Sequence, residues 1–244
     1  MPKLSIIIAT YNSEKSLGKA LESVMTQTFQ DWECVIVDGA SKDNTLQIIE
    51  EYEKRDVRFR HVSEPDNGIY DAFNKGWRLA KGEWIHYLGS DDRIVEDGFA
   101  RLFSQEVDAD LVGGGVYLVR DGEKNKLQFT YRADGCHQAF VAKCEVIEKL
   151  GGFDETYKII ADKDLLVRIV TSGYVVLNCE IPIAYFYVGG VSQKLSSLIK
   201  VNKERYKIYK SHHYKKNPLL KCCWIVVLAV MGTVKHKLLK FINQ

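Results

Sequence analysis

Two adjacent carboxylates, Asp91 and Asp92, follow an apolar run at Trp84–Leu88 that is typical of a buried strand. Like charges this close repel each other, and neither gains by facing an apolar core. A hard divalent cation relieves the repulsion, and Mg²⁺ or Mn²⁺ held by few carboxylates shares its coordination with phosphate oxygens. A solvated, Asp-rich turn is the alternative. The pair therefore indicates a metal-assisted phosphate site if other parts of the chain support one.

Two earlier apolar runs also end in polar side chains. Leu4–Thr10 leads into Tyr11 and Asn12, and Cys34–Val37 ends in Asp38. If these runs are parallel strands, their carboxyl ends lie along the edge of a sheet where α/β proteins bind ligands. A carboxylate there accepts hydrogen bonds from a nucleobase or from ribose hydroxyls, and an aromatic ring offers a face for the base. The residue types favour a nucleotide site.

Helical segments separate these strands. Asn12 or Ser13 can cap a helix that runs to Met25 with an apolar stripe on one face. Further helices are predicted at 41–55 and 69–80, on either side of a short strand. Strand and helix thus alternate three times before the strand that precedes Asp91. This order predicts an α/β fold, with right-handed crossovers and a mostly parallel, Rossmann-like sheet covered by helices on both faces.

After Asp97 the pattern becomes that of a smaller antiparallel portion with short helices. Gly113–Gly115 separates two apolar stretches that we predict to be separate strands. Gly151 follows a helical stretch, and glycine commonly ends a helix. The predicted elements of this portion are strands at 111–112, 116–119, 127–131 and 183–188 and helices at 143–150 and 162–171.

The charge of the chain is divided unevenly. The 244 residues carry a net charge of +2, but residues 194–244 hold 12 Lys and Arg and one acid, a net of +11. Residues 1–193 therefore hold 22 basic and 31 acidic side chains, a net of −9. We predict a domain at 1–193, with halves at 1–96 and 97–193, and a basic helical tail at 194–244. The acidic body argues against nucleic acid as a partner, and the tail indicates an anionic surface.

An apolar run at Cys222–Val234 lies within this tail. Its 13 residues are fewer than the roughly 20 that span a bilayer as a helix. The run and the basic, apolar stretch after it are typical of a segment lying in the interface of an anionic membrane. A helix packed on the body or on the second subunit of a homodimer is the alternative. Six cysteines without CxxC spacing, and no visible secretory signal, predict a cytoplasmic chain at the inner face of the cell membrane.

The first turn excludes two common classes of nucleotide-binding protein. Dinucleotide-binding oxidoreductases need glycines there so that the backbone can approach a pyrophosphate. In this chain the turn is Ala9–Ser13, which has no glycine, and no GxxxxGK[ST] motif occurs. Phosphates must therefore be bound by a metal and by side chains.

Six segments carry motifs in a fixed order: SIIIATYN at 5–12, VDGASKDNT at 37–45, SEPDNGIYDA at 63–72, GSDD at 89–92, GGFDE at 151–155 and ADKDLLVR at 161–168. In this order they resemble family-2 glycosyltransferases of the GT-A fold, which are inverting enzymes that use nucleotide-activated sugars. The resemblance covers about residues 3–192.

The resemblance implies a role for each matching side chain. Asp92 matches the metal ligand, and Asp162 matches the base that activates the acceptor. Ala161 replaces a glutamate that often precedes this base, so Asp164 is a second candidate. Phe73 stands where many members have an arginine. The residues that match the donor-nucleotide pocket are Thr10, Tyr11, Asn12, Glu14, Asp38 and Asp91.

Other polar groups are candidates for contact with the acceptor or the diphosphate. His137 and Gln138 follow a Gly-Cys pair, and Ser192 ends a glycine-containing loop. A structural role is the alternative for each of them. Asp164 belongs to the same group if it is not the base.

The sequence thus predicts an inverting hexosyltransferase that uses Mg²⁺ or Mn²⁺. It is expected to move a sugar from a UDP-sugar to a hydroxyl of a glycan or lipid-linked acceptor. Similar bacterial enzymes build surface polysaccharides, such as O-antigen, on lipid-diphosphate carriers. A sugar-nucleotide nucleotidyltransferase and a non-catalytic sugar-nucleotide-binding protein are the alternatives.

Overall fold

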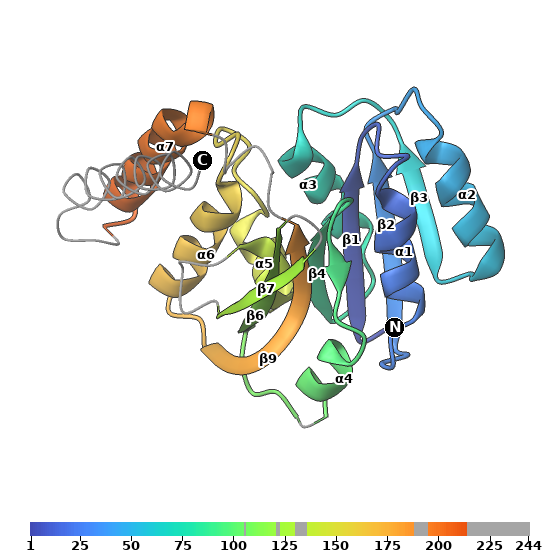
Figure 1. Cartoon of the computed structure of the whole chain (residues 1–244). Coiled ribbons are helices and arrows are strands. Elements are labelled where there is room, and N and C mark those ends of the chain that lie inside the picture. The colour runs from blue at the N-terminus through green and yellow to red at the C-terminus, as the bar shows by residue number, and fades with distance from the viewer. Residues whose placement is uncertain (105, 121–122, 130–135, 188–194, 214–244) are drawn as a thin grey trace, which may run out of the picture. The chain divides into compact units, whose positions relative to one another are not determined.

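The structure is a computed structural model that describes residues 1–104, 106–120, 123–129, 136–187 and 195–213 (Figure 1). The chain divides into two compact units, Met1–Val188 and Gly189–Gln244. The sheet lies in the first unit, where the predicted α/β architecture is confirmed.

Four parallel strands form the N-terminal half of the sheet, in the order β3-β2-β1-β4. Thr10 pairs with Asp38 across β1 and β2, and Ala9 pairs with Gly89 across β1 and β4. The carboxyl ends of these strands therefore share one edge, as predicted. The elements are β1 (Leu4–Thr10), α1 (Leu17–Met25), β2 (Trp32–Asp38), α2 (Thr45–Arg55), β3 (Phe59–Ser63), α3 (Ile69–Leu79) and β4 (Trp84–Gly89).

Helices cover both faces of this half because alternate strand residues point to opposite sides. Ile6, Ile8 and Ile36 belong to the core cluster that also contains the apolar faces of α1 and α2. On the other face, Gly76 of α3 lies against Ile7, where a Cβ atom would come within 2.3 Å of an Ile7 methyl carbon. A glycine at this position lets α3 approach the sheet closely. The two layers of helix are visible in Figure 1.

The C-terminal half adds mainly antiparallel pairings. Strand β4 pairs antiparallel with β8, β8 with β6, and β6 with β7, while β9 runs parallel to β6 and antiparallel to β5. The elements are β5 (Arg93–Ile94), α4 (Gly98–Leu102), β6 (Leu111–Arg120), β7 (Glu123–Phe129), the short helix η2 (His137–Ala139), β8 (Phe140–Lys143), α5 (Cys144–Leu150), α6 (Ala161–Thr171) and β9 (Val176–Tyr187).

Three local predictions were wrong. The glycines at 113–115 do not separate two strands, because β6 runs through them and Gly114 lies where a Cβ would come within 2.6 Å of the Ile181 carbonyl oxygen. Strand β9 begins at Val176 instead of residue 183. Helix α1 begins at Leu17 without a side-chain cap. Asn12 Oδ1 accepts from the Lys42 N–H instead, and the Ser13 hydroxyl bonds to the Tyr11 carbonyl oxygen and to Ser90 Oγ.

The second unit contains a short helix, η4 (Leu195–Ser197), and α7 (Leu198–Ser211). Within the described ranges, no helix combines the length and apolar character that crossing a bilayer requires. The apolar run at 222–234 lies outside the described residues, so its predicted position at a membrane surface stays a prediction.

Candidate active site

Asn12 ties together the loops that follow β1 and β2. Its backbone N–H donates to Ser41 Oγ at 2.8 Å, and its Oδ1 accepts from the Lys42 N–H at 2.8 Å. The backbone of Asn12 is left-handed, with φ of 48°, a conformation that Asn adopts more readily than most residues. The side chain therefore fixes the polar edge of the sheet.

Glu14 makes a second connection to this loop. One of its carboxylate oxygens accepts from the backbone N–H of Asn44 at 3.1 Å and from the Asn44 amide at 2.9 Å. Asp43 in turn accepts from the Glu14 N–H at 3.2 Å. Glu14 thus stabilises the start of α2, and its predicted contact with a nucleotide stays a prediction.

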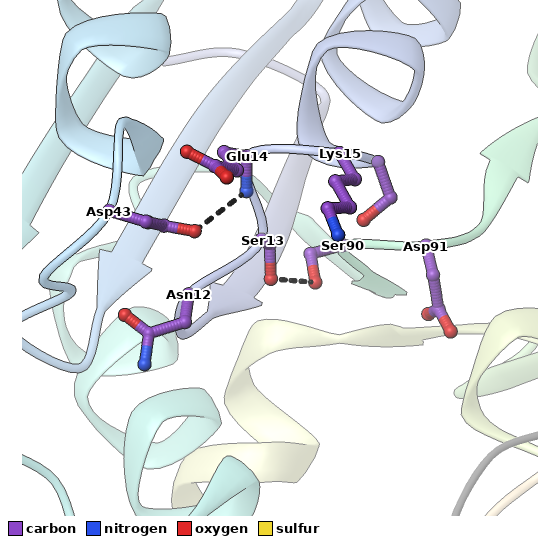
Figure 2. Close-up of a pocket in the computed structure, with 8 residues that line it drawn as sticks. Asn12, Ser13, Glu14, Lys15, Asp43, Ser90 and Asp91 are labelled. Carbon is purple, nitrogen blue, oxygen red and sulfur yellow. Dashed lines mark hydrogen bonds between the residues drawn. The ribbon is translucent and has the colours of Figure 1, made fainter.

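A cavity of about 440 Å³ opens between these loops and the end of β4 (Figure 2). At its centre Ser13 Oγ and Ser90 Oγ lie 2.9 Å apart, which joins the ends of β1 and β4. Among the lining residues, Lys15 carries the only positive charge, beside three carboxylates. The lining residues are Asn12, Ser13, Glu14, Lys15, Ser16, Asp43, Ser90 and Asp91.

A second hollow of about 290 Å³ shares Ser13 and Ser90 with this cavity. Tyr11 lines it and is 60% exposed, an arrangement that leaves one aromatic ring open to a planar ligand. Thr10 contributes a buried Oγ1 without a hydrogen-bond partner in the described part of the chain. The two hollows together offer a polar and an aromatic compartment at one edge of the sheet.

Asp38 lies beneath this surface and has no exposed area. Its carboxylate accepts from the Ser41 N–H at 3.0 Å, from Ser41 Oγ and from Ser63 Oγ at 2.6 Å. In this conformation Asp38 shapes the loop that presents Ser41 to Asn12. Its predicted contact with a nucleobase stays a prediction.

The two carboxylates after β4 differ sharply in environment. Asp91 is exposed, whereas Asp92 is 2% exposed. Asp92 accepts from the Gln138 amide at 2.6 Å and from the Tyr187 N–H at 2.9 Å. Burial, with the negative charge of Asp91, raises the pKa of Asp92 to about 7. The sequence alone showed the pair but not this asymmetry.

This donor set fits a hard divalent cation that is only partly held by protein. Asp92 is a carboxylate whose pKa is raised by burial and by the negative charge of neighbouring Asp91, so a bound cation would favour its charged form. Among the described residues, no group of three His, Cys, Asp or Glu side chains is placed to hold a metal. Mg²⁺ and Mn²⁺ commonly bind to one or two carboxylates together with substrate phosphates, which agrees with such a site.

Asp162 begins α6 on the far side of η2 from β4. Its Oδ2 accepts from His137 Nδ1 at 3.2 Å and its Oδ1 accepts from the Lys163 N–H at 2.8 Å. Burial favours a higher pKa for Asp162, but the hydrogen bond and charge of His137, with the Lys163 N–H and charge, overcome it and lower the pKa. Asp162 is thus held as a carboxylate at neutral pH, the form that a general base needs.

Asp164 lies two residues farther along the same helix and occupies a different environment. It is 1% exposed and accepts from Arg168 Nε at 2.7 Å. The same arginine donates to the carbonyl oxygens of Leu150 and Gly152 at 2.8 and 2.6 Å. Asp164 therefore belongs to a buried ion pair that joins α6 to the end of α5.

The structure brings Asp92 and Asp162 together through neighbouring residues. Gln138 contacts Asp92 and His137 contacts Asp162. The charges of both carboxylates also add to the burial that raises the pKa of Cys136 to about 12. Ser192 lies outside the described residues.

Sequence analysis did not identify several residues that line the two hollows. Lys15, Asp43 and Ser90 line the first, and Asp66 and Ile69 line the second. Asp43, Asp66 and Ser90 lie inside the recognised motifs, so their position after strand ends was the available signal. Lys15 carried no such signal, since a lone lysine before a helix is usually a solvated surface residue.

Known proteins similar to this chain are glycosyltransferases. The sequence model of the family described as "Glycosyl transferase family 2" matches residues 5–150. A "PGL/p-HBAD biosynthesis glycosyltransferase" of Mycobacterium bovis BCG is 32% identical over 206 residues, 80% of each chain. Glycosyltransferase GlyG of Streptococcus pneumoniae is 31% identical over 152 residues, which cover 61% of this chain and 50% of GlyG.

Solved structures agree with the GT-A fold. The 1–349 fragment of S. aureus TarS in complex with UDP-GlcNAc has a TM-score of 0.70 at 21% identity, covering 84% of this chain and 65% of that one. The mannosyltransferase PcManGT of Pyrobaculum calidifontis, in complex with GDP-Man and Mn²⁺, has a TM-score of 0.72 at 17% identity, covering 96% and 74%. The family model matches more than half of the chain, and the Mycobacterium bovis BCG relative is 32% identical over 80% of it. This protein therefore belongs to glycosyl transferase family 2.

Proposed function

We propose that this glycosyltransferase is an inverting, divalent-metal-dependent enzyme that moves a sugar from a UDP-sugar to an acceptor hydroxyl. The observation that carries the proposal is the pairing of two unlike carboxylates at the end of β4 and the start of α6. Asp92 is buried beside another acid, and Asp162 is held in its charged form. The first suits a cation and the second suits a base.

The donor fits the edge of the sheet formed by the loops after β1, β2 and β4. Tyr11 offers a ring face for the base and lines the second hollow with Thr10, while Asn12 and Glu14 line the polar cavity. Asp91, the exposed member of the acidic pair, is free to accept from ribose hydroxyls. The nucleotide-sugar complexes of TarS and PcManGT, which share the fold, support a sugar nucleotide as the donor class.

Asp162 acts as the general base. It takes the proton of the acceptor hydroxyl while that oxygen forms a bond to the anomeric carbon of the donor. The bond from this carbon to the diphosphate oxygen breaks on the opposite face, and the nucleoside diphosphate leaves with the bonding electrons, so the configuration inverts. Asp92 would hold the cation, which when bound neutralises the negative charge that grows on the leaving diphosphate.

The acceptor is proposed to be a lipid-diphosphate-linked glycan at the cytoplasmic face of the membrane, in surface polysaccharide synthesis. The charge of residues 194–244 supports this location, and α7 adds a structural reason. Four of its lysines are exposed at spacings of three, four and three residues, which places them on one side of a helix. These lysines are Lys200, Lys203, Lys207 and Lys210.

A donor screen tests the proposal. The full chain is incubated with Mg²⁺ or Mn²⁺, a panel of UDP-sugars and GDP-mannose, and lipid-diphosphate glycan acceptors, and released nucleoside diphosphate is measured. We expect release from a UDP-sugar that requires both cation and acceptor, with a product of inverted anomeric configuration by NMR. Release of pyrophosphate from a nucleoside triphosphate, or no transfer from any donor with either cation, would contradict the proposal.

A further inference from the structure

His137 is oriented by two neighbours on different elements. Because a carboxylate only accepts hydrogen bonds, the 3.2 Å contact with Asp162 Oδ2 requires the proton on Nδ1 of the imidazole. The ring of Phe73, from α3, meets the imidazole edge-on with centroids 5.1 Å apart. Phe73 is fully buried, so the imidazole cannot turn toward α3 without a clash. One ring orientation and one tautomer are thereby selected.

Asp162 depends on His137 for the orientation of its Oδ2. Its other oxygen accepts from the Lys163 N–H at 2.8 Å and lies 3.4 Å from the Tyr70 hydroxyl, which donates to the Ile159 carbonyl oxygen at 2.8 Å. The carboxylate is thus held from both sides, by its own helix at Oδ1 and by η2 at Oδ2. Removal of the imidazole frees one side.

Gln138, the residue after His137, orients the carboxylate of Asp92 in the same way. Gln138 is 3% exposed and donates to Asp92 Oδ2 at 2.6 Å. Two consecutive residues of η2 therefore contact one carboxylate after β4 and one at the start of α6. Through these two side chains, η2 fixes the position of Asp92, the proposed cation ligand, relative to Asp162, the proposed base.

We propose that His137 is a positioning residue for the acceptor-activating base, whose Nδ1–H holds the Asp162 carboxylate in one orientation. The proposal rests on the proposed role of Asp162 as the base. It assigns His137 to Asp162, instead of the direct contact with acceptor or diphosphate expected from sequence. The arrangement reverses the usual hydrolase pairing, because here the imidazole orients a carboxylate that accepts the proton.

Two substitutions separate positioning from packing. His137→Leu removes the donor, whereas His137→Asn places an amide N–H near the position of Nδ1. The matched control is His61→Leu. His61 lies on β3, and its Nδ1 also pairs with a carboxylate, that of Glu53 on α2, at 2.8 Å. Circular dichroism and unfolding curves establish that each variant is folded.

A residue that positions the base should affect kcat and leave the KM for donor nearly unchanged. We expect His137→Leu to lower kcat by roughly 10- to 100-fold, a part of the roughly 10²- to 10⁴-fold that general-base catalysis contributes, with the KM for donor changed by less than about twofold. His137→Asn should recover most of this loss, and His61→Leu should behave as the wild type. Equal losses in the Leu and Asn variants, or an effect on acceptor KM alone, would show that His137 contacts the substrate and would overturn the proposal.

A pH titration of Asp162 tests the positioning role of His137 even if no sugar transfer is detected. The Asp162 carboxyl carbon is followed by ¹³C NMR in the full chain, with Asp162→Asn to assign the signal. Loss of the His137 hydrogen bond and charge should raise the pKa of Asp162 in His137→Leu, where the Lys163 N–H and charge still lower it and Tyr70 and Cys136 still face the carboxylate. An unchanged pKa would refute the positioning role, even if the enzyme proved active. A raised pKa in a protein without transfer activity would support the contact and refute the proposed function instead.

Discussion

Asp92 is the residue whose environment most directly bears on the proposed cation binding. A buried carboxylate with a pKa of about 7 holds a proton in part at neutral pH. A cation and a proton therefore compete for the same oxygens, and the affinity for Mn²⁺ should rise by about tenfold per pH unit below this pKa and level off above it. Calorimetric titration of Mn²⁺ into the full chain with nucleoside diphosphate, from about pH 5.5 to pH 8, measures this dependence.

The control for this prediction is Asp92→Asn, which removes the titrating group. It should weaken Mn²⁺ binding and abolish the rise with pH, while Asp97→Asn, on an exposed turn after β5, should leave both unchanged. An affinity that does not vary with pH in the wild-type protein would contradict the assignment of Asp92 as a ligand.

Residue types at strand ends predicted which side chains lie at this edge of the sheet, but not their burial. Asp38 and Asp92 stand in equivalent sequence contexts to exposed Asp91, yet both are covered. The groups that cover Asp92 are Gln138 and Tyr187, which lie 46 and 95 residues away in sequence. The local sequence pattern contains no information about such distant partners. The pKa shifts of Asp92 and Asp162 and the contact between His137 and Asp162 could therefore be found only in the structure.

The elements of the N-terminal half were predictable because each has a strong local period. Continuous apolar strands and amphipathic helices alternate there, and tertiary contacts agree with local preference. The glycines of β6 misled the prediction because glycine is usually a turn signal, whereas here close approach of β9 requires it. Long-range packing decided the conformation at these positions.

At the same scale, Asn74 connects α3 to the segment that leads into α6. Its amide donates to the Phe153 carbonyl at 2.9 Å and to Glu155 at 2.8 Å, and its Oδ1 accepts from the Phe153 N–H at 2.8 Å. Asn74→Asp removes both donations and places a second negative charge beside Glu155. We expect a loss of about 3 kcal/mol in the free energy of unfolding, measured with urea.

Asn67→Asp provides the comparison, because its side chain is exposed on the turn before α3. Its effect on unfolding should stay within about 0.5 kcal/mol. If Asn74→Asp were equally mild, the hydrogen bonds of Asn74 would contribute little to the α3–α6 connection.

For the whole molecule, the division into an acidic body and a basic tail was evident from composition. The structure divides the chain into units at Met1–Val188 and Gly189–Gln244, and the predicted domain boundary after residue 193 stays a prediction. Composition could not show on which side of α7 the lysines lie, because this depends on where the helix begins. The lysine stripe makes electrostatic membrane contact a testable property.

We expect the full chain to sediment with vesicles containing roughly 30% anionic lipid and to be released by salt, since each lysine near such a surface contributes about 1 kcal/mol. Replacement of the four exposed α7 lysines by Gln should weaken binding at least tenfold at low salt. A control with the same change in net charge should bind nearly as the wild type. Equal binding of both variants, or binding to neutral vesicles, would contradict the role of α7. The control residues are Lys19, Lys54, Lys81 and Lys149.

Asp162 of α6 is proposed to activate the acceptor in a sugar transfer. The transfer rates of Asp162→Asn and Asp164→Asn beside the wild type, normalised to folded protein, decide this role. We predict that Asp162→Asn keeps donor binding but loses about 10³-fold in kcat. Asp164→Asn, which breaks the pair with Arg168, should unfold more easily yet transfer sugar when folded. Wild-type turnover in Asp162→Asn, with turnover abolished in folded Asp164→Asn, would contradict the account.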